Sequence, residues 1–217
     1  MISALTPLPV LGVPIESKKL KAFQDRLLSK TPKNKKRETG PSKDQTNDLL
    51  TLYQTGRIAD AKNLAISIAE EFPTHPFARK LLGTIFRQQG KKTAAVDANK
   101  RAVNLSPKDA VALSNLGVTL AEVGRLEEAE VSYNQAIALK PDYAEAHRNL
   151  TLVKRFDSQD EQYSKMQELC LDDKISEEER CHINFGLAKA CEDLGNFGQA
   201  YAHFREGNAL RKKPVSY

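Results

Sequence analysis

The stretch that decides the fold is LSNLGVTLAEVGRLEEAEVSYNQAIALKP, residues 113–141. On both sides of Gly124 its apolar residues recur every three or four positions, which is the spacing of one face of an α-helix. Glycine adopts the left-handed backbone conformation that ends helices at low cost, so Gly124 is expected in that conformation between two helices. Pro141 cannot continue a helix and stops the second one. The stretch therefore predicts a helical hairpin.

The hairpin is one copy of an internal repeat. The residues that recur at intervals of 34 are Gly56, Gly90 and Gly124, then Ala61, Ala95 and Ala129, and then Pro73, Pro107 and Pro141. Three residue types that keep one period over three copies indicate a repeat architecture, in which neighbouring units stack to bury their apolar faces.

Residues 113–141 resemble a near-consensus tetratricopeptide repeat. Its signature positions hold Leu113, Leu116, Gly117, Leu120, Ala129, Tyr133, Ala136 and Pro141. The resemblance implies an all-α fold, a right-handed α-solenoid of antiparallel helix pairs. Gly117 and Ala129 are small, so the backbones of the two helices are expected to approach closely there. Asp142 is expected to cap the following helix.

The repeat pattern predicts the domain organisation. The predicted parts are a basic N-terminal extension over 1–42, a repeat domain over 43–211 and a tail over 212–217. Repeats are expected at about 42–75, 76–109 and 110–143, followed by an enlarged repeat at 144–180 and a last repeat at 181–211. Within the enlarged repeat, 144–156 predicts one helix and 159–171 a shorter one. Ser176 and Glu179 have the spacing of a capping box, which predicts a new helix start.

The N-terminal extension is the basic part of the chain. Residues 1–42 contain nine Lys and Arg against three Asp and Glu, whereas the whole chain has a formal charge of +5. Residues Ser17 to Ser29 predict a short amphipathic helix, followed by a charged linker. Two interpretations stay open: a docking helix with a basic arm for an acidic partner or membrane surface, or a helix folded onto the first repeat. Because the charge is confined to this segment, we do not infer nucleic-acid binding.

Composition places the chain among soluble proteins. No segment approaches the ~18 consecutive apolar residues of a membrane span, and prolines interrupt the apolar N-terminus. We expect no membrane insertion and a cytoplasmic location. Three cysteines, Cys170, Cys181 and Cys191, lack ligand spacing and are expected to be small core residues in a reducing compartment.

The sequence contains no pattern typical of catalysis or of cofactor binding. The glycines follow the repeat period rather than a phosphate-binding motif, and the four histidines are far apart in sequence. His147 and His203 are expected on helix surfaces. We therefore expect no catalytic residue, no metal site and no cofactor, and the chain is interpreted as a non-enzyme.

The first helices of stacked repeats line a concave groove, where such scaffolds hold an extended peptide. The predicted groove residues are Lys80, Thr84, Arg87, Asn115, Val118, Arg148, Asn149, Leu152 and Arg155. Asn115 and Asn149 occupy equivalent places one period apart, and a carboxamide can both donate to and accept from a peptide backbone. This pair resembles the asparagine ladder of O-linked N-acetylglucosamine transferases. The alternative, that asparagine is simply common at this consensus position, stays open.

The charged residues of the predicted groove indicate the charge of the peptide that it binds. Glu145 and Asn149 stand where the carboxylate clamp of chaperone-binding repeat proteins needs cations, so that clamp is excluded. The cluster of Lys80, Arg87, Arg148 and Arg155 favours a mildly acidic peptide.

The C-terminal segment FGLAKACEDLGNFGQAYAHFREGN (185–208) resembles the last repeat of bacterial proteins that join tetratricopeptide repeats to a sulfotransferase domain. The main functional hypothesis is a scaffold that binds a protein or peptide ligand in its groove. The alternative is the substrate-presenting or regulatory region of a sulfotransferase-type transferase whose catalytic domain is not in this chain. Self-association through the apolar faces of the end repeats stays open.

Overall fold

The computed structural model describes residues 40–212. Over this range it contains ten α-helices and no β-strand, which confirms the predicted all-α helical-repeat fold. The helices are α2 (Lys43–Gln54), α3 (Ile58–Glu71), α4 (Phe77–Gln88), α5 (Lys92–Leu105), α6 (Ala110–Glu122), α7 (Leu126–Leu139), α8 (Ala144–Thr151), α9 (Glu161–Leu171), α10 (Glu177–Asp193) and α11 (Phe197–Lys212). The helix predicted between Ser17 and Ser29 lies outside the described residues.

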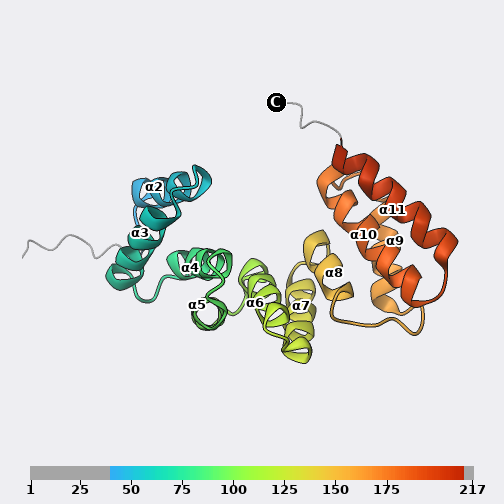
Figure 1. The fold of residues 1–217 in the computed structure, drawn as a ribbon, viewed down its shortest axis with the longest axis horizontal. Coiled ribbons are helices and arrows are strands. Elements are labelled where there is room, and N and C mark those ends of the chain that lie inside the picture. The colour runs from blue at the N-terminus through green and yellow to red at the C-terminus, as the bar shows by residue number, and fades with distance from the viewer. Residues whose placement is uncertain (1–39, 213–217) are drawn as a thin grey trace, which may run out of the picture. The chain divides into compact units, whose positions relative to one another are not determined.

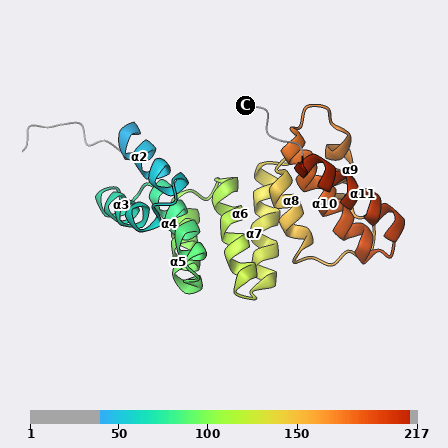
Figure 2. The same cartoon turned by 45° about the horizontal axis from the view of Figure 1, so that its top comes forward.

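Each helix packs against the next one along the chain (Figure 1 and Figure 2). Two pairs of first helices also meet: α4 contacts α6, and α8 contacts α10. The helices α3, α5 and α7 each end two residues before a proline of the repeat, as expected from the helix-breaking ring. Repeated local signals thus place the first helices α4, α6 and α8 in equivalent positions.

Glycine closes the turn inside four of the helix pairs. Gly56, Gly90, Gly124 and Gly195 have φ of +75°, +69°, +80° and +75°, and no other described residue has a positive φ. Next to Gly124, the backbone N–H of Arg125 donates to the carbonyl of Leu120 over 3.0 Å. This bond is that of a Schellman motif, which uses a left-handed residue to satisfy the last carbonyls of a helix. The left-handed conformation predicted for Gly124 is confirmed.

The close approach predicted at Gly117 involves a side chain rather than a second backbone. A β-carbon at Gly117 would lie 2.6 Å from Cε1 of Tyr133, whose ring is buried against α6. In the preceding pair, a β-carbon at Gly83 would lie 2.0 Å from Oδ1 of Asn99. The glycine thus makes room for the side chain of the residue that follows it by sixteen positions on the second helix.

The helix predicted over 144–156 is shorter than expected. It ends at Thr151, and the N–H groups of the next two residues bond three residues back instead of four, to the carbonyls of Asn149 and Leu150. This tight turn redirects the chain so that Phe156 enters the core of the C-terminal helices, where it is 1% exposed. Burial of a large aromatic side chain outweighs the local helical pattern.

Two capping predictions had different outcomes. Ser176 and Glu179 form the expected capping box, in which the Ser176 hydroxyl accepts from the Glu179 backbone and the Glu179 carboxylate accepts from the Ser176 backbone. Asp142 does not cap α8, because the chain enters that helix through Tyr143, which makes no side-chain cap. The helix α10 begins at Glu177, 33 residues after the start of α8 at Ala144 and four residues before the predicted start of the last repeat at 181.

The described cysteines are all unpaired. Cys191 is fully buried, as expected of a small core residue, whereas Cys170 and Cys181 are half-buried. Burial raises the pKa of the Cys170 and Cys181 thiols. None of the helices over 40–212 is long and apolar enough to cross a bilayer.

Candidate peptide-binding pocket

Side chains of four helices enclose a pocket of about 220 Å³. Its lining consists of Thr84 and Arg87 from α4, Asn99 from α5, Asn115, Val118 and Thr119 from α6, and Glu145 and Asn149 from α8. Thr84 and Arg87 of α4 are three positions apart, Asn115 of α6 is three and four positions before Val118 and Thr119, and Glu145 and Asn149 of α8 are four apart, so the lining residues of each helix lie on one side of it. The pocket is almost entirely polar, since Val118 is its one apolar residue.

The pocket brings together five of the nine predicted groove residues: Thr84, Arg87, Asn115, Val118 and Asn149. Lys80 lies outside it, with Nζ 2.7 Å from Oδ2 of Asp109. Leu152 and Arg155 are exposed and follow the C-terminal end of α8, because that helix is shorter than predicted.

The predicted cationic cluster does not form a free basic surface. Lys80 is paired with Asp109, and Arg87 lies 3.1 Å from Oε1 of Glu122. The guanidinium of Arg148 lies over the ring of Phe185, 5.7 Å from its centre. Two of the four predicted cations are thus paired with carboxylates, whereas Arg148 contacts a neutral ring and Arg155 is exposed, so the preference for an acidic peptide stays a prediction.

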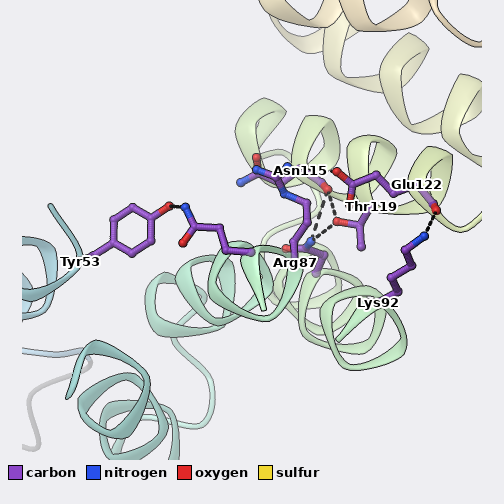
Figure 3. A network of polar contacts seen from close by, with 8 residues as sticks. Tyr53, Arg87, Lys92, Asn115, Thr119 and Glu122 are labelled. Atoms are coloured by element: carbon purple, nitrogen blue, oxygen red, sulfur yellow. Dashed lines mark hydrogen bonds and ion pairs between the residues drawn. The ribbon is translucent and has the colours of Figure 1, made fainter. Parts of the chain in front are cut away.

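A small hydrogen-bond network holds one wall of the pocket (Figure 3). Asn99 is only 2% exposed, and its Nδ2 donates to Oγ1 of Thr119 over 2.7 Å and to the carbonyl oxygen of Asn115 over 3.3 Å. The Thr119 hydroxyl donates to the same carbonyl over 2.8 Å. In the described part of the chain, Oδ1 of Asn99 has no hydrogen-bond partner. A buried acceptor without a partner costs about 1–3 kcal/mol, which a ligand or water could relieve.

The carboxamides of Asn115 and Asn149 are available to a ligand. The network uses the backbone carbonyl of Asn115 and leaves its side chain out. Among residues 40–212, neither carboxamide forms a hydrogen bond with the protein. Asn149 is 9% exposed and Asn115 is half-buried, so water reaches both only in part.

The Tyr133 hydroxyl is affected by burial and by charges of both signs beside the pocket. Burial raises the pKa of the Tyr133 hydroxyl, and the charges of Glu145 and Glu122 raise it further, against the opposing effect of Arg87. The Tyr133 hydroxyl therefore stays protonated at neutral pH.

Sequence reasoning left two lining residues, Asn99 and Thr119, out of the groove, whereas it placed Glu145 there and used it only to exclude the carboxylate clamp. Asn99 lies on a second helix, where the groove was not expected, and Thr119 is buried beneath it. One signal was visible, because Asn99 stands where Tyr133 stands one period later and where the repeat usually has an aromatic residue.

The histidines are placed differently from the prediction. His147 was expected on a helix surface, but it is 1% exposed, with Nε2 2.9 Å from the carbonyl oxygen of Pro141. Burial lowers the pKa of His147, which favours the neutral ring. His203 is half-buried, and its Nδ1 lies 2.9 Å from Oδ1 of Asn184. Within residues 40–212, no three His, Cys, Asp or Glu side chains are grouped so that they could hold a metal ion.

An all-α stack of glycine-closed helix pairs, with a polar pocket between its first helices, defines a helical-repeat protein. The particular repeat is identified by two family models: residues 50–110 match the tetratricopeptide repeat and residues 120–154 match a TPR repeat model. The chain therefore contains tetratricopeptide repeats.

Known proteins resemble this chain over part of their length. It is 32% identical to a peroxisomal targeting signal receptor of Kluyveromyces lactis, over 40% of this chain and 16% of the receptor. It is 31% identical to the probable UDP-N-acetylglucosamine–peptide N-acetylglucosaminyltransferase SPINDLY of Arabidopsis thaliana, over 49% of this chain and 10% of that protein. The matches thus span less than a fifth of either relative.

A similar solved structure is that of YrrB, described as a TPR protein with an unusual peptide-binding site. The TM-score is 0.58 at 14% sequence identity, and the match covers 88% of this chain and 92% of YrrB. At this identity the likeness concerns the fold.

Proposed function

We propose that the protein is an interaction scaffold that binds an extended peptide segment of a partner across the pocket. The observation that carries the proposal is the pair of free carboxamides, Asn115 and Asn149, at equivalent positions of α6 and α8. The names of two similar proteins, a targeting signal receptor and a repeat protein with a peptide-binding site, support binding of this kind.

The chemistry of the pocket suits a peptide backbone. An extended chain presents one N–H donor and one carbonyl acceptor per residue, and each carboxamide offers two donors and an acceptor. Each hydrogen bond contributes a net ~1 kcal/mol, so the two asparagines together would supply a substantial part of a micromolar affinity. Because they read the backbone, they would bind sequences that differ in side chains.

The test begins with a peptide array probed with the full chain, and one binding peptide is then titrated by fluorescence anisotropy. The changes Asn115→Ala and Asn149→Ala should each weaken binding by about fivefold, since each removes a net ~1 kcal/mol. Circular dichroism should report unchanged helicity. Asn134→Ala is the matched control, because Asn134 is exposed on α7 and does not line the pocket. Unchanged affinity in both pocket variants would refute the proposal.

A second candidate is that the chain presents substrate to a transferase domain. It is supported by the resemblance of residues 185–208 to the segment that precedes sulfotransferase domains, and by the similarity to a longer glycosyltransferase. Reading the gene beyond codon 217 tests it: an open frame that continues into a sulfotransferase domain supports this function, and a stop codon contradicts it.

A further inference from the structure

The pocket is lined by an asparagine at the position where the next repeat has an aromatic residue. In the pair α6–α7, the ring of Tyr133 fills the space against Gly117. One period earlier, Gly83 faces the much shorter Asn99. The side chain of Asn99 is smaller than that of tyrosine. It lines the pocket of about 220 Å³.

The lining carries one unbalanced charge, and it is negative. Arg87 and Glu145 are the charged residues of the lining, and Arg87 is paired with Glu122. Glu145 is exposed and forms no ion pair with another described residue. The carboxylates of Glu145 and Glu122 together raise the pKa of Tyr133 more than Arg87 lowers it.

The remaining polar groups of the lining offer several acceptors. The carboxamide oxygens of Asn115 and Asn149 are free of bonds to the described protein, whereas Oδ1 of Asn99 is buried against Gly83. A ligand that carries many donors and a positive charge, and that accepts nothing, complements this set. The guanidinium group has five N–H donors, no acceptor and a weaker hydration than an ammonium, so it loses less on entering a half-buried pocket.

We propose that the pocket lined by Asn99 binds the guanidinium of an arginine side chain of the bound peptide, with Glu145 as its counter-ion. This inference rests on the proposed peptide-binding function. It reverses the preference expected from the sequence, since the ligand would be basic at this position instead of acidic. The Nδ2 groups of Asn115 and Asn149 would donate to the peptide backbone, while their oxygens and Glu145 would accept from the guanidinium.

The first test uses single amino acids, so that it does not depend on peptide binding. N-acetyl-arginine amide, N-acetyl-lysine amide and N-acetyl-glutamate amide are titrated against the ¹⁵N-labelled protein, and the side-chain amide signals of its asparagines are followed by NMR. The arginine probe should shift the signals of Asn99, Asn115 and Asn149 at lower concentration than the lysine probe. No shift, equal response to lysine, or a stronger response to glutamate would overturn the inference.

The second test uses peptides from the array with arginine or alanine at each position. Arginine at one position should improve affinity by about tenfold, as expected for hydrogen bonds to a charged group. Glu145→Gln should reduce this gain by about three- to fivefold, because the carboxylate is exposed and the pair is partly screened. Glu127→Gln, an exposed change on α7 outside the pocket, is the control.

Asn99→Tyr gives the second pair the same glycine–tyrosine contact that the third pair already has. It should abolish the arginine preference and preserve the thermal stability of the fold. If peptides bind without an arginine preference, the inference falls and the proposed function stands. If the arginine probe binds and no peptide does, the peptide function falls and the guanidinium site stands.

Discussion

At the scale of single residues, a glycine of the first helix packs against one later side chain in two of the helix pairs. Gly117 faces the ring of Tyr133, and Gly83 faces the carboxamide of Asn99. The glycine is thus required by its neighbour's side chain and not by its own conformation, since its φ is negative. The helix pair with Asn99 and the pair with Tyr133 have similar helices, but they differ in the side chain that faces the glycine.

Gly117→Leu should destabilise the fold by ~3 kcal/mol, because even a β-carbon would collide with a packed ring that has no free space. Urea denaturation measures the loss. Gly198→Leu is the control: Gly198 lies in α11 with nothing within 4 Å of an added β-carbon, so this change should be neutral or stabilising. Equal stability of the Gly117 variant and the wild type would contradict the contact.

At the scale of secondary-structure elements, the residue that caps α6 also joins this helix to α4. Asp109 caps α6, since its Oδ1 accepts from the N–H groups of Val111 and Ala112, while its Oδ2 pairs with Lys80 of α4. The predicted groove cation Lys80 therefore holds α4 to the start of α6. A local sequence motif can predict the cap, but it does not predict the ion pair, because Lys80 and Asp109 are 29 residues apart.

Asp109→Asn should keep the cap, lose the ion pair and lower the free energy of unfolding by ~1 kcal/mol at neutral pH. Burial raises the pKa of Asp109, but the bonds from Lys80 and the backbone N–H groups lower it by more, so it lies below its ordinary value of 3.8. The stabilisation is thus complete above about pH 4 and is lost as the pH falls through the lowered pKa.

Urea denaturation of wild type and variant between pH 7 and pH 2 measures this difference. The two stabilities should converge at the acid end. A difference that persists undiminished at pH 2 would mean that the charge of Asp109 is not its source.

At the scale of the whole described domain, stability is distributed along the stack. Apolar clusters lie between successive pairs, from the one around Leu49 and Ile68 to the one around Phe156 and Leu187. A first helix at the end of the stack has fewer partners than an inner one. The two helices differ strongly in the number of buried residues: α2 buries one, Leu49, whereas α6 buries seven.

Hydrogen–deuterium exchange should therefore rank the helices by position. The backbone amides of α6 and α7 should exchange most slowly, and those of α2 should exchange about tenfold faster or more, because local opening of an end helix exposes little apolar surface. Mass spectrometry of peptic fragments resolves the two regions. Equal protection of α2 and α6 would indicate a single cooperative unit and would contradict this distribution.

The sequence by itself determined the helix pairs, the glycine turns and the equivalent positions of α4, α6 and α8. These features follow from local signals that recur with one period, such as the backbone freedom of Gly124 and the missing N–H of Pro141. It also predicted five residues of the pocket, because a face of a helix follows directly from spacing.

Only the tertiary structure decided the early end of α8, the pairing of Lys80 and Arg87 with carboxylates, and the pocket lined by Asn99. Each of these depends on contacts between residues that are distant in the chain. Periodicity shows which way a side chain points, but it does not show what the side chain meets there. The pocket's chemistry is therefore a property of the packed helices.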